Sequence, residues 1–228
     1  MVYGLTKLLS RIVFKMLMDV RVEGAEHVPL TGGAIVIGNH HSALDPHLLL
    51  WALPRRACWY VKATSFEPRI WNWYWRQLGA RPVLSGGDNR EARQHGLRAI
   101  RAGHLLVILP EGDVSPPGQL YPFRGGFLKL AVTEGVPVVP TIIVGSEHGL
   151  RNSWHPTRLT DFLPRRAKIR VEFLPPLRLE NPMLDRELFD AQLVSVRRLV
   201  SDRADELRNR EGLRCREPEG LMDYSYHS

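Results

Sequence analysis

A histidine and an aspartate separated by four residues are the part of this sequence best suited to chemistry. His40 and Asp45 follow closely on the apolar run Ala34–Gly38. A histidine titrates near neutral pH and can remove a proton from a hydroxyl group. A nearby carboxylate can hold the imidazole in one tautomer and stabilise the imidazolium that forms. The pair therefore indicates a general base with its orienting acid, although Asp45 followed by Pro46 is also typical of a helix start.

Two later segments have the same character. The apolar run Leu105–Leu109 is followed by Glu111, and Val138–Val144 forms a third run. Unbroken apolar runs of this length are typical of strands that are buried on both faces of a parallel sheet. The carboxyl ends of such strands line the ligand crevice of open α/β sheets. We therefore expect His40, Asp45 and Glu111 to meet at one edge of a sheet.

With these segments in place, the sequence resembles a known family, the glycerolphosphate and lysophosphatidate acyltransferases. Residues 39–46, Asn-His-His-Ser-Ala-Leu-Asp-Pro, resemble the first block of that family, whose core is H-x-x-x-x-D. Order and spacing agree over roughly residues 20–175. The counterparts of the third and fourth blocks are residues 110–112, 118–126 and 136–140.

The resemblance implies an O-acyltransferase that moves a fatty acyl group from a thioester to a hydroxyl of a lipid acceptor. His40 would be the general base and Asp45 its orienting group. Acyl-coenzyme A or acyl carrier protein would be the co-substrate, no metal or other cofactor would be required, and lysophosphatidate or a related lysolipid would be the acceptor. Backbone amides near Gly112 or at residues 137–139 are candidates to bind the oxyanion. The expected substrate-binding residues are Glu111, Gly112, Asp113, Ser115, Phe123, Arg124 and Pro137, with Arg81 and Arg90 as substitutes for an arginine of the second block.

Two places depart from the family pattern. The third block commonly reads F-P-E-G-T-R-S, but here Asp113 and Val114 stand in place of threonine and arginine, and Ser85 stands near the expected arginine of the second block. The family associates these positions with the phosphate of the acceptor. A carboxylate repels phosphate, whereas it accepts hydrogen bonds from the hydroxyls of a polyol. The alternative acceptor is therefore a lipid without a phosphate monoester, such as a glycolipid or a glycosylated isoprenoid.

Composition limits the classes of protein to consider. With 228 residues, of which 44% are hydrophobic, the chain can bury a core as one domain. Its net charge of +7 favours an anionic membrane, an anionic substrate or nucleic acid as a partner. No zinc-ligand pairs, helix-turn-helix or aromatic RNA-binding strand accompanies the charge, so nucleic acid is not expected. Cys58 and Cys215 are too few for a disulfide framework and favour a reducing cytoplasm.

The first twenty residues predict an amphipathic helix. Lys7, Arg11 and Lys15 recur at every fourth position among apolar residues. Three cations in the span argue against a transmembrane helix, and no small-residue cleavage site follows. We expect a helix in the headgroup layer that holds a peripheral protein on membrane lipids at the cytoplasmic face. The alternative is a helix packed on the sheet, and the tryptophan-rich residues 66–76 leave the same two alternatives open.

The alternation of strands and helices predicts a layered α/β fold, with a mostly parallel sheet flanked by helices and an N-terminal amphipathic helix. The expected organisation is a membrane-associating helix (residues 1–22), an acyltransferase domain (23–212) and a flexible tail (213–228). The expected strands are 20–24, 34–38, 58–63, 105–109, 138–144 and 168–174, and the expected helices after the first are 46–53, a tryptophan-rich helix, 90–102, 126–133 and 185–210.

Two other classes of function remain open from the sequence. His40, His41, Asp45 and His47 carry the ligand types of a metal-dependent hydrolase. A non-catalytic membrane-binding protein is the other, if the changed third block reflects lost activity. Metal content and an acyl-thioester turnover assay would separate these classes from an acyltransferase.

Overall fold

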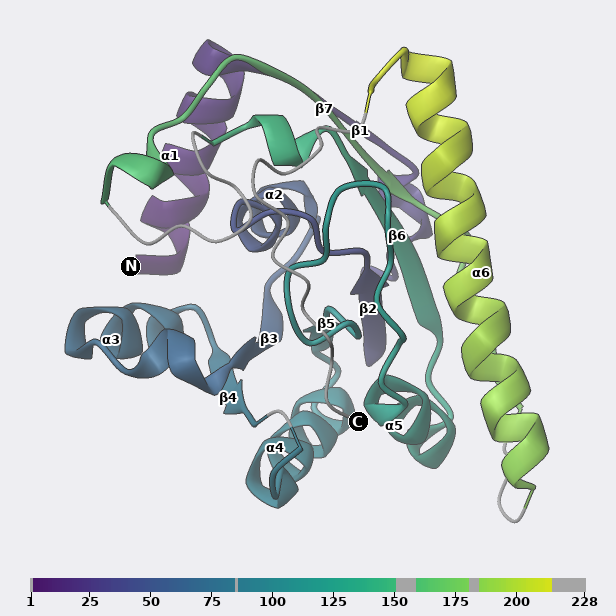
Figure 1. The fold of residues 1–228 in the computed structure, drawn as a ribbon. Helices are drawn as coiled ribbons and strands as arrows, with labels where there is room; N and C mark the ends of the chain where they lie inside the picture. Colours follow the sequence, from purple (N-terminus) through teal and green to yellow (C-terminus); the bar gives the residue numbers. More distant parts are fainter. Residues whose placement is uncertain (1, 85, 151–158, 181–184, 215–228) are drawn as a thin grey trace.

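The computed structural model describes residues 2–84, 86–150, 159–180 and 185–214 of the chain (Figure 1). The described residues form a seven-stranded sheet with the strand order β1-β7-β6-β2-β5-β3-β4. Within it β6 and β7 are antiparallel and the other neighbours are parallel. The predicted mostly parallel α/β sheet is confirmed. The strands are β1 (Met18–Glu23), β2 (Ala34–Gly38), β3 (Ala57–Lys62), β4 (Ala80–Val83), β5 (Leu105–Ile108), β6 (Val138–Val144) and β7 (Ala167–Phe173).

Helices cover both faces of the sheet (Figure 1). The side chains of β2 alternate between the two faces, so Val36 packs in one apolar cluster while Ile35 and Ile37 pack in the other. The cluster around Val36 includes residues of α1, α2 and α3, and the cluster around Ile35 includes residues of α4, α5 and α6. The helices are α1 (Val2–Leu17), α2 (Asp45–Ala52), α3 (Arg69–Gln77), α4 (Arg90–Arg101), α5 (Gly126–Glu134) and α6 (Arg186–Glu211).

The unbroken apolar runs became the strands at the centre of the sheet. Every residue of β2, β5 and β6 is buried. Each fully buried valine, leucine or isoleucine side chain stabilises the fold by about 1.5–3 kcal/mol. These three strands therefore fix the position of the strand ends from which residues 39–45 and 109–112 emerge.

One strand and one helix boundary differ from the sequence prediction. Strand β4 was not predicted, because Arg81 and Pro82 occupy half of a four-residue run. A proline is tolerated there because β4 is an edge strand, which has no neighbour on one side. The N-terminal helix ends at Leu17 rather than at residue 22, because β1 already begins at Met18. The predicted tail lies outside the described residues from position 215 onward.

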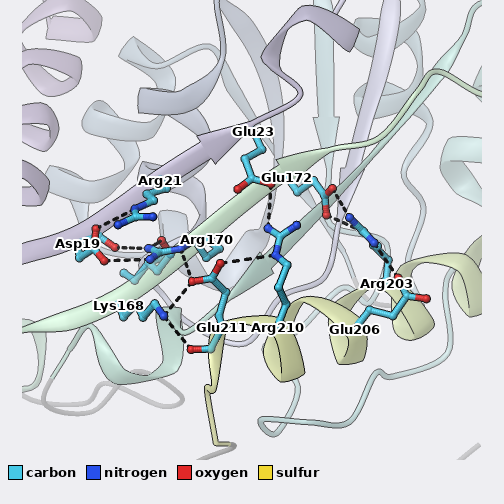
Figure 2. Close-up of polar contacts among 11 residues, drawn as sticks. Asp19, Arg21, Glu23, Lys168, Arg170, Glu172, Arg203, Glu206, Arg210 and Glu211 are labelled. Carbon is cyan, nitrogen blue, oxygen red and sulfur yellow. Dashed lines mark hydrogen bonds and ion pairs between the residues drawn. The ribbon is translucent and has the colours of Figure 1, made fainter.

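Charged side chains fasten the β1–β7 edge of the sheet to α6 (Figure 2). The buried guanidinium of Arg170 on β7 contacts Asp19 of β1 and Glu211 of α6, each at 2.9 Å. Further along α6, Arg203 binds Glu172 through two hydrogen bonds of 2.7 and 2.8 Å. The charged side chains of β1 and β7 therefore face the C-terminal half of α6.

Helix α1 is divided between packing and exposure. Tyr3 and Phe14 are buried, and the Phe14 ring meets Trp51 of α2 edge-on with the ring centroids 5.8 Å apart. The ammonium group of Lys7 donates to the carbonyl oxygen of Leu53 at 2.7 Å. The opposite side of α1 exposes a row of large apolar residues: Leu5, Leu8, Leu9, Ile12 and Met16.

Candidate active site

The turn between β2 and α2 carries His40 and Asp45. Just before it, the buried side chain of Asn39 extends the pairing of β2 with β6. Its amide nitrogen donates to the Ile143 carbonyl at 2.7 Å, and its amide oxygen accepts from the Ile143 N–H at 2.8 Å. The two bonds fix the point at which the chain leaves the sheet, so the backbone of His40 starts from a rigid support.

His40 and Asp45 form a hydrogen-bonded pair. The distance between His40 Nδ1 and Asp45 Oδ2 is 2.9 Å. The same carboxylate oxygen accepts the backbone N–H groups of His41 and Ser42 at 2.8 and 2.9 Å. Asp45 is fully buried, whereas the His40 side chain is 15% exposed. Because Asp45 engages Nδ1, Nε2 is the ring nitrogen left to accept a proton from a substrate hydroxyl.

Glu111 binds the backbone of this turn. One of its carboxylate oxygens accepts the His40 N–H at 2.7 Å, and the other accepts the Tyr121 N–H at 2.8 Å. Burial raises the pKa of Glu111 to about 7, although the hydrogen bonds that it accepts act in the opposite direction. Glu111 therefore ties the loop after β5 to the backbone of His40, and its role here is to hold the site together.

Ser115 makes a second connection between the same two segments. Its N–H donates to the His40 carbonyl at 2.7 Å, and its hydroxyl oxygen lies 2.9 Å from His41 Nδ1. Both Ser115 and His41 are buried. The structure thus brings Glu111 to His40, as the sequence predicted for the strand ends. Ser115, which the resemblance implied as a substrate-binding residue, joins them, and both residues contact the backbone of the turn.

The two segments named as candidate oxyanion donors lie in different places. The Gly112 N–H donates to the Leu109 carbonyl at 3.1 Å. Gly112 has a φ of 74° and lies against Arg124, whose Nε would be 2.8 Å from an added Cβ. Pro137 precedes β6, whose Val138 pairs with Ile35 near the start of β2. The sequence prediction was therefore misplaced for residues 137–139, which lie at the opposite edge of the sheet from His40.

A cavity of about 570 Å³ opens beside the Pro110–Gly112 turn. Its wall includes the ends of β3 and β5 and the first turns of α4 and α5. Apolar side chains such as Ile108, Leu109 and Phe127 form part of it. The basic residues that line it are Lys62, Arg90, Arg93, Arg124 and Lys129.

Arg90 and Arg124 were predicted from the sequence, whereas Lys62, Arg93 and Lys129 were missed. Lys62 is the last residue of β3, so the strand-end rule could have found it. Arg93 lies one helical turn after Arg90, on a helix whose position relative to the strand ends is a tertiary property. The position of Lys129 at the cavity likewise depends on how α5 packs against the sheet.

Two acidic residues near the cavity are paired with its cations. Asp113 lies 2.5 Å from the ammonium of Lys62, and Asp88 lies 2.7 Å from Arg90 Nε. The charge of Asp113 is therefore countered by a partner that the sequence did not reveal. This ion pair weakens the argument that Asp113 repels a phosphate.

Two of the remaining predicted positions, Arg81 and Phe123, do not line the cavity. Arg81 donates to the Ala80 carbonyl at 3.0 Å and lies outside the cavity wall. Phe123 is buried, with its ring edge-on to Phe127. Ser85 lies outside the described residues.

The histidines of the turn and of α2 do not converge on one point. His41 contacts Ser115, whereas His47 Nε2 lies 2.9 Å from the Tyr74 hydroxyl. Among the residues that the structure describes, no group of three or more histidine, cysteine, aspartate or glutamate side chains has the geometry to hold a metal ion. The metal-hydrolase alternative therefore lacks a ligand cluster in this part of the chain.

Comparison with protein families gives a match over residues 19–144 to the family model described as Acyltransferase. The chain belongs to the acyltransferase family. The matched residues run from β1 to the end of β6 and contain the turn of His40, the loop of Glu111 and the basic cavity. The family that the sequence resembles is thus confirmed.

Relatives of this acyltransferase include enzymes named 1-acyl-sn-glycerol-3-phosphate acyltransferase. The one from Limnanthes douglasii is 28% identical over 176 residues, which cover 74% of this chain and 58% of the relative. The alpha enzyme of Mus musculus is 30% identical over 179 residues, which cover 73% and 58%. The chain thus spans a little over half the length of these curated relatives.

The fold of this acyltransferase also has a solved counterpart. The crystal structure of the 1-acyl-sn-glycerophosphate (LPA) acyltransferase PlsC from Thermotoga maritima matches with a TM-score of 0.70 and 26% sequence identity. The match covers 90% of this chain and 79% of the other.

Proposed function

We propose that this acyltransferase moves a fatty acyl group from a thioester to a hydroxyl of lysophosphatidate or a related lysolipid. The observation that carries the proposal is the His40–Asp45 pair at 2.9 Å. Glu111, which binds the backbone of His40, lies in the turn whose Pro110 and Gly112 line the basic cavity. The donor is acyl-coenzyme A or acyl carrier protein. The names of the Limnanthes, mouse and Thermotoga proteins support the choice of acceptor.

The reaction follows from the geometry of the pair. Nε2 of His40 takes the proton of the acceptor hydroxyl as the hydroxyl oxygen attacks the thioester carbonyl. Asp45 stabilises the imidazolium that forms. The tetrahedral intermediate then expels the thiolate, which takes the proton from His40 and leaves as a thiol. General-base assistance of this kind accelerates a reaction by about 10²- to 10⁴-fold, and positioning of the two substrates supplies a further part.

The charges of the cavity support an acceptor that carries a phosphate. Five cations line it, and two of them, Lys62 and Arg90, are paired with Asp113 and Asp88. No acidic residue in the described chain forms an ion pair with the other three, Arg93, Arg124 and Lys129. Arginine binds phosphate through two parallel hydrogen bonds. This balance favours lysophosphatidate over the glycolipid and isoprenoid acceptors.

The surface of α1 and α3 supports peripheral attachment to a membrane. The two helices are in contact, and α3 exposes Ile70, Trp71 and Trp73. Trp71 stacks on Phe162, which is also exposed. Apolar and tryptophan side chains of this kind enter the interfacial layer of a bilayer. No helix in the described part of the chain has both the length and the hydropathy to span a membrane.

We therefore propose that the apolar row of α1 and the tryptophans of α3 rest on the lipid that holds the substrates. Attachment to the cytoplasmic face would bring the protein to the compartment that contains acyl-coenzyme A and acyl carrier protein. A lysolipid would then reach the cavity without leaving the bilayer.

An acceptor panel tests the proposed function. One labelled acyl-coenzyme A and one acyl carrier protein carrying the same chain would each be offered with lysophosphatidate, glycerol 3-phosphate, a lysophospholipid with a headgroup, or a glycolipid. We expect selective formation of the diacyl phosphate lipid from lysophosphatidate. Preferred acylation of the glycolipid would contradict the choice of acceptor, and absence of acyl transfer to every acceptor would contradict the function.

A further inference from the structure

A group of charged residues lies buried behind the His40–Asp45 pair, and the mechanism above does not use it. Its members are His41 in the turn, Glu147 in the 3₁₀ helix η3 (Ser146–His148) after β6, and Arg208 near the end of α6. Their exposed fractions are 1%, 3% and 5%. Three segments far apart in the sequence thus bring two opposite charges and an imidazole together in the interior.

The contacts within this group are incomplete. Arg208 Nη2 lies 3.8 Å from Glu147 Oε1, a distance that permits attraction but is too long for a hydrogen bond. Within this group and Asp45, several buried side-chain atoms have no hydrogen-bond partner among the described residues: Glu147 Oε1 and Oε2, Arg208 Nε and Nη2, His41 Nε2 and Asp45 Oδ1. Buried polar atoms of this kind are normally satisfied by ordered internal water.

The group is coupled to the reactive pair through His41. Burial is the main reason why the pKa of His41 is lowered; the charge of Arg208 lowers it further, whereas Glu147 and Asp45 raise it. The backbone N–H of the same residue donates to Asp45 Oδ2 at 2.8 Å, the atom that binds His40. Arg208, Glu147 and Asp45 therefore surround one buried imidazole.

Stability alone does not account for this arrangement. Removing two opposite charges from water costs more than their attraction returns unless the geometry is excellent, and a buried ion pair is often replaceable by apolar residues without loss. Here the ion pair is long, and several of its polar atoms have no hydrogen-bond partner among the residues that the structure describes. The position of the pair next to the site suggests a role in the reaction.

We propose that Glu147 and Arg208 are positioning residues for the His40–Asp45 pair, acting through His41. They hold the carboxylate of Asp45 in place and balance the charge that the imidazole of His40 experiences. The proposal rests on the proposed function, because it assigns these residues to the same base.

Opposite effects of the two charges on the pH profile distinguish this role from a structural one. In Glu147→Gln the charge of Arg208 remains and disfavours protonation, so the acid limb of the kcat/KM profile should move to lower pH. In Arg208→Gln the charge of Glu147 remains, and the limb should move to higher pH. The expected movement is about 1 pH unit, the usual size of a pKa shift in a folded protein. The double variant should return close to the parent profile.

A matched control is available on the same arginine. Asp205 Oδ1 lies at the same distance of 3.8 Å from Arg208 Nη1, but its side chain is 64% exposed. Asp205→Asn should leave the pH profile unchanged. The other charged groups that face His40 are Asp45 from α2 and Glu111 from the loop after β5, and both remain in all these variants.

The titration of His41 gives a readout that does not depend on turnover. Nuclear magnetic resonance of histidine-labelled protein, with the His41 signal assigned from His41→Gln, should show its pKa fall in Glu147→Gln and rise in Arg208→Gln. This experiment applies even if no acceptor is turned over, which would be a failure of the proposed function. If Arg208→Gln alone fails to fold, the test is whether the shift in Glu147→Gln is reversed in the double variant. A pH profile of an active single variant that coincides with the parent profile, or an unchanged His41 titration in the folded single variants, would overturn the proposal.

Discussion

Replacing Asp45 by asparagine separates the charge of this residue from its structural contacts. Oδ2 accepts three hydrogen bonds, from His40 Nδ1 and from the backbone N–H groups of His41 and Ser42. In Asp45→Asn an amide oxygen of nearly the same shape can still accept them. What is lost is the negative charge that stabilises the His40 imidazolium in the transition state.

The magnitude follows from these contacts. Loss of effective general-base assistance should lower kcat by about 10²- to 10⁴-fold, equivalent to roughly 3–5 kcal/mol in the activation free energy. A hydrogen bond to a charged group contributes about 1.5–3 kcal/mol and a neutral one about 0.5–1.5 kcal/mol. The free energy of unfolding should therefore fall by about 1 kcal/mol for each of the three bonds. Asp45→Ala is less informative because it also leaves two buried N–H groups without an acceptor.

The assay combines turnover with stability. Thiol release from an acyl thioester in the presence of lysophosphatidate measures kcat, and urea denaturation at the same pH measures the free energy of unfolding. A folded Asp45→Asn enzyme that retains kcat within tenfold of the parent would refute the reasoning, because the charge would then be dispensable for the base.

Three further predictions concern other parts of the molecule. Burial raises the pKa of Glu111 from 4.5 to about 7. Between these two pH values the folded state therefore binds more protons than the unfolded state. The free energy of unfolding should fall by up to about 3 kcal/mol as the pH rises through this window. Glu111→Gln should remove this pH dependence, as measured by urea denaturation from pH 4.5 to 8, and an equal slope in both proteins would contradict the assignment. Charge reversal of Arg11 and Lys15 to glutamate should weaken co-sedimentation with anionic vesicles by about 1 kcal/mol per cation and reduce its salt dependence. The matched control is reversal of Arg186 and Arg198 on α6, both of which are exposed, and equal losses in the two proteins would show that α1 has no special role. Arg93→Ala and Arg124→Ala should each raise KM for a phosphate-bearing acceptor roughly 10- to 100-fold, the equivalent of a charge-assisted hydrogen bond. Arg81 lies outside the cavity, so Arg81→Ala should leave KM unchanged. An equal rise in KM in all three variants would contradict the assignment of the cavity to phosphate.

The fold was predictable where local sequence and tertiary environment agree. The strands β2, β5 and β6 are unbroken apolar runs because both of their faces are covered, and the sequence placed their bounds to within a residue. The strand β4 was missed because an edge strand needs neither a complete ladder nor a complete apolar face. Short edge strands therefore carry too little pattern to be recognised.

The site was predictable to the extent that it depends on strand ends. His40 and Glu111 follow neighbouring strands, so the sequence predicted that they meet, and the structure joins them at 2.7 Å. It could not reveal that Glu111 binds backbone, since that depends on the path of the loop. Pro137 was assigned to the site only from its resemblance to the fourth block of the family. It precedes β6 and therefore lies near the start of β2, away from the carboxyl end that leads to His40.

Residues brought in by helix packing had no sequence signal. Lys129 reaches the basic cavity from α5, and Arg208 reaches the interior from the last turns of α6. On a helix rich in arginine, the pattern does not distinguish a buried guanidinium from its exposed neighbours. Only the docking of α6 against β6 selects Arg208 for burial.

The most direct test of the central claim is acyl transfer to lysophosphatidate by the parent and by His40→Ala, with the protein concentration and vesicles held equal. His40→Ala removes the base and leaves the basic cavity intact, while Glu111 keeps its bond to the backbone of residue 40. The account predicts that the variant folds, binds lysophosphatidate with an affinity close to that of the parent, and loses at least about 10²-fold in kcat. A folded His40→Ala enzyme with turnover close to that of the parent would contradict it.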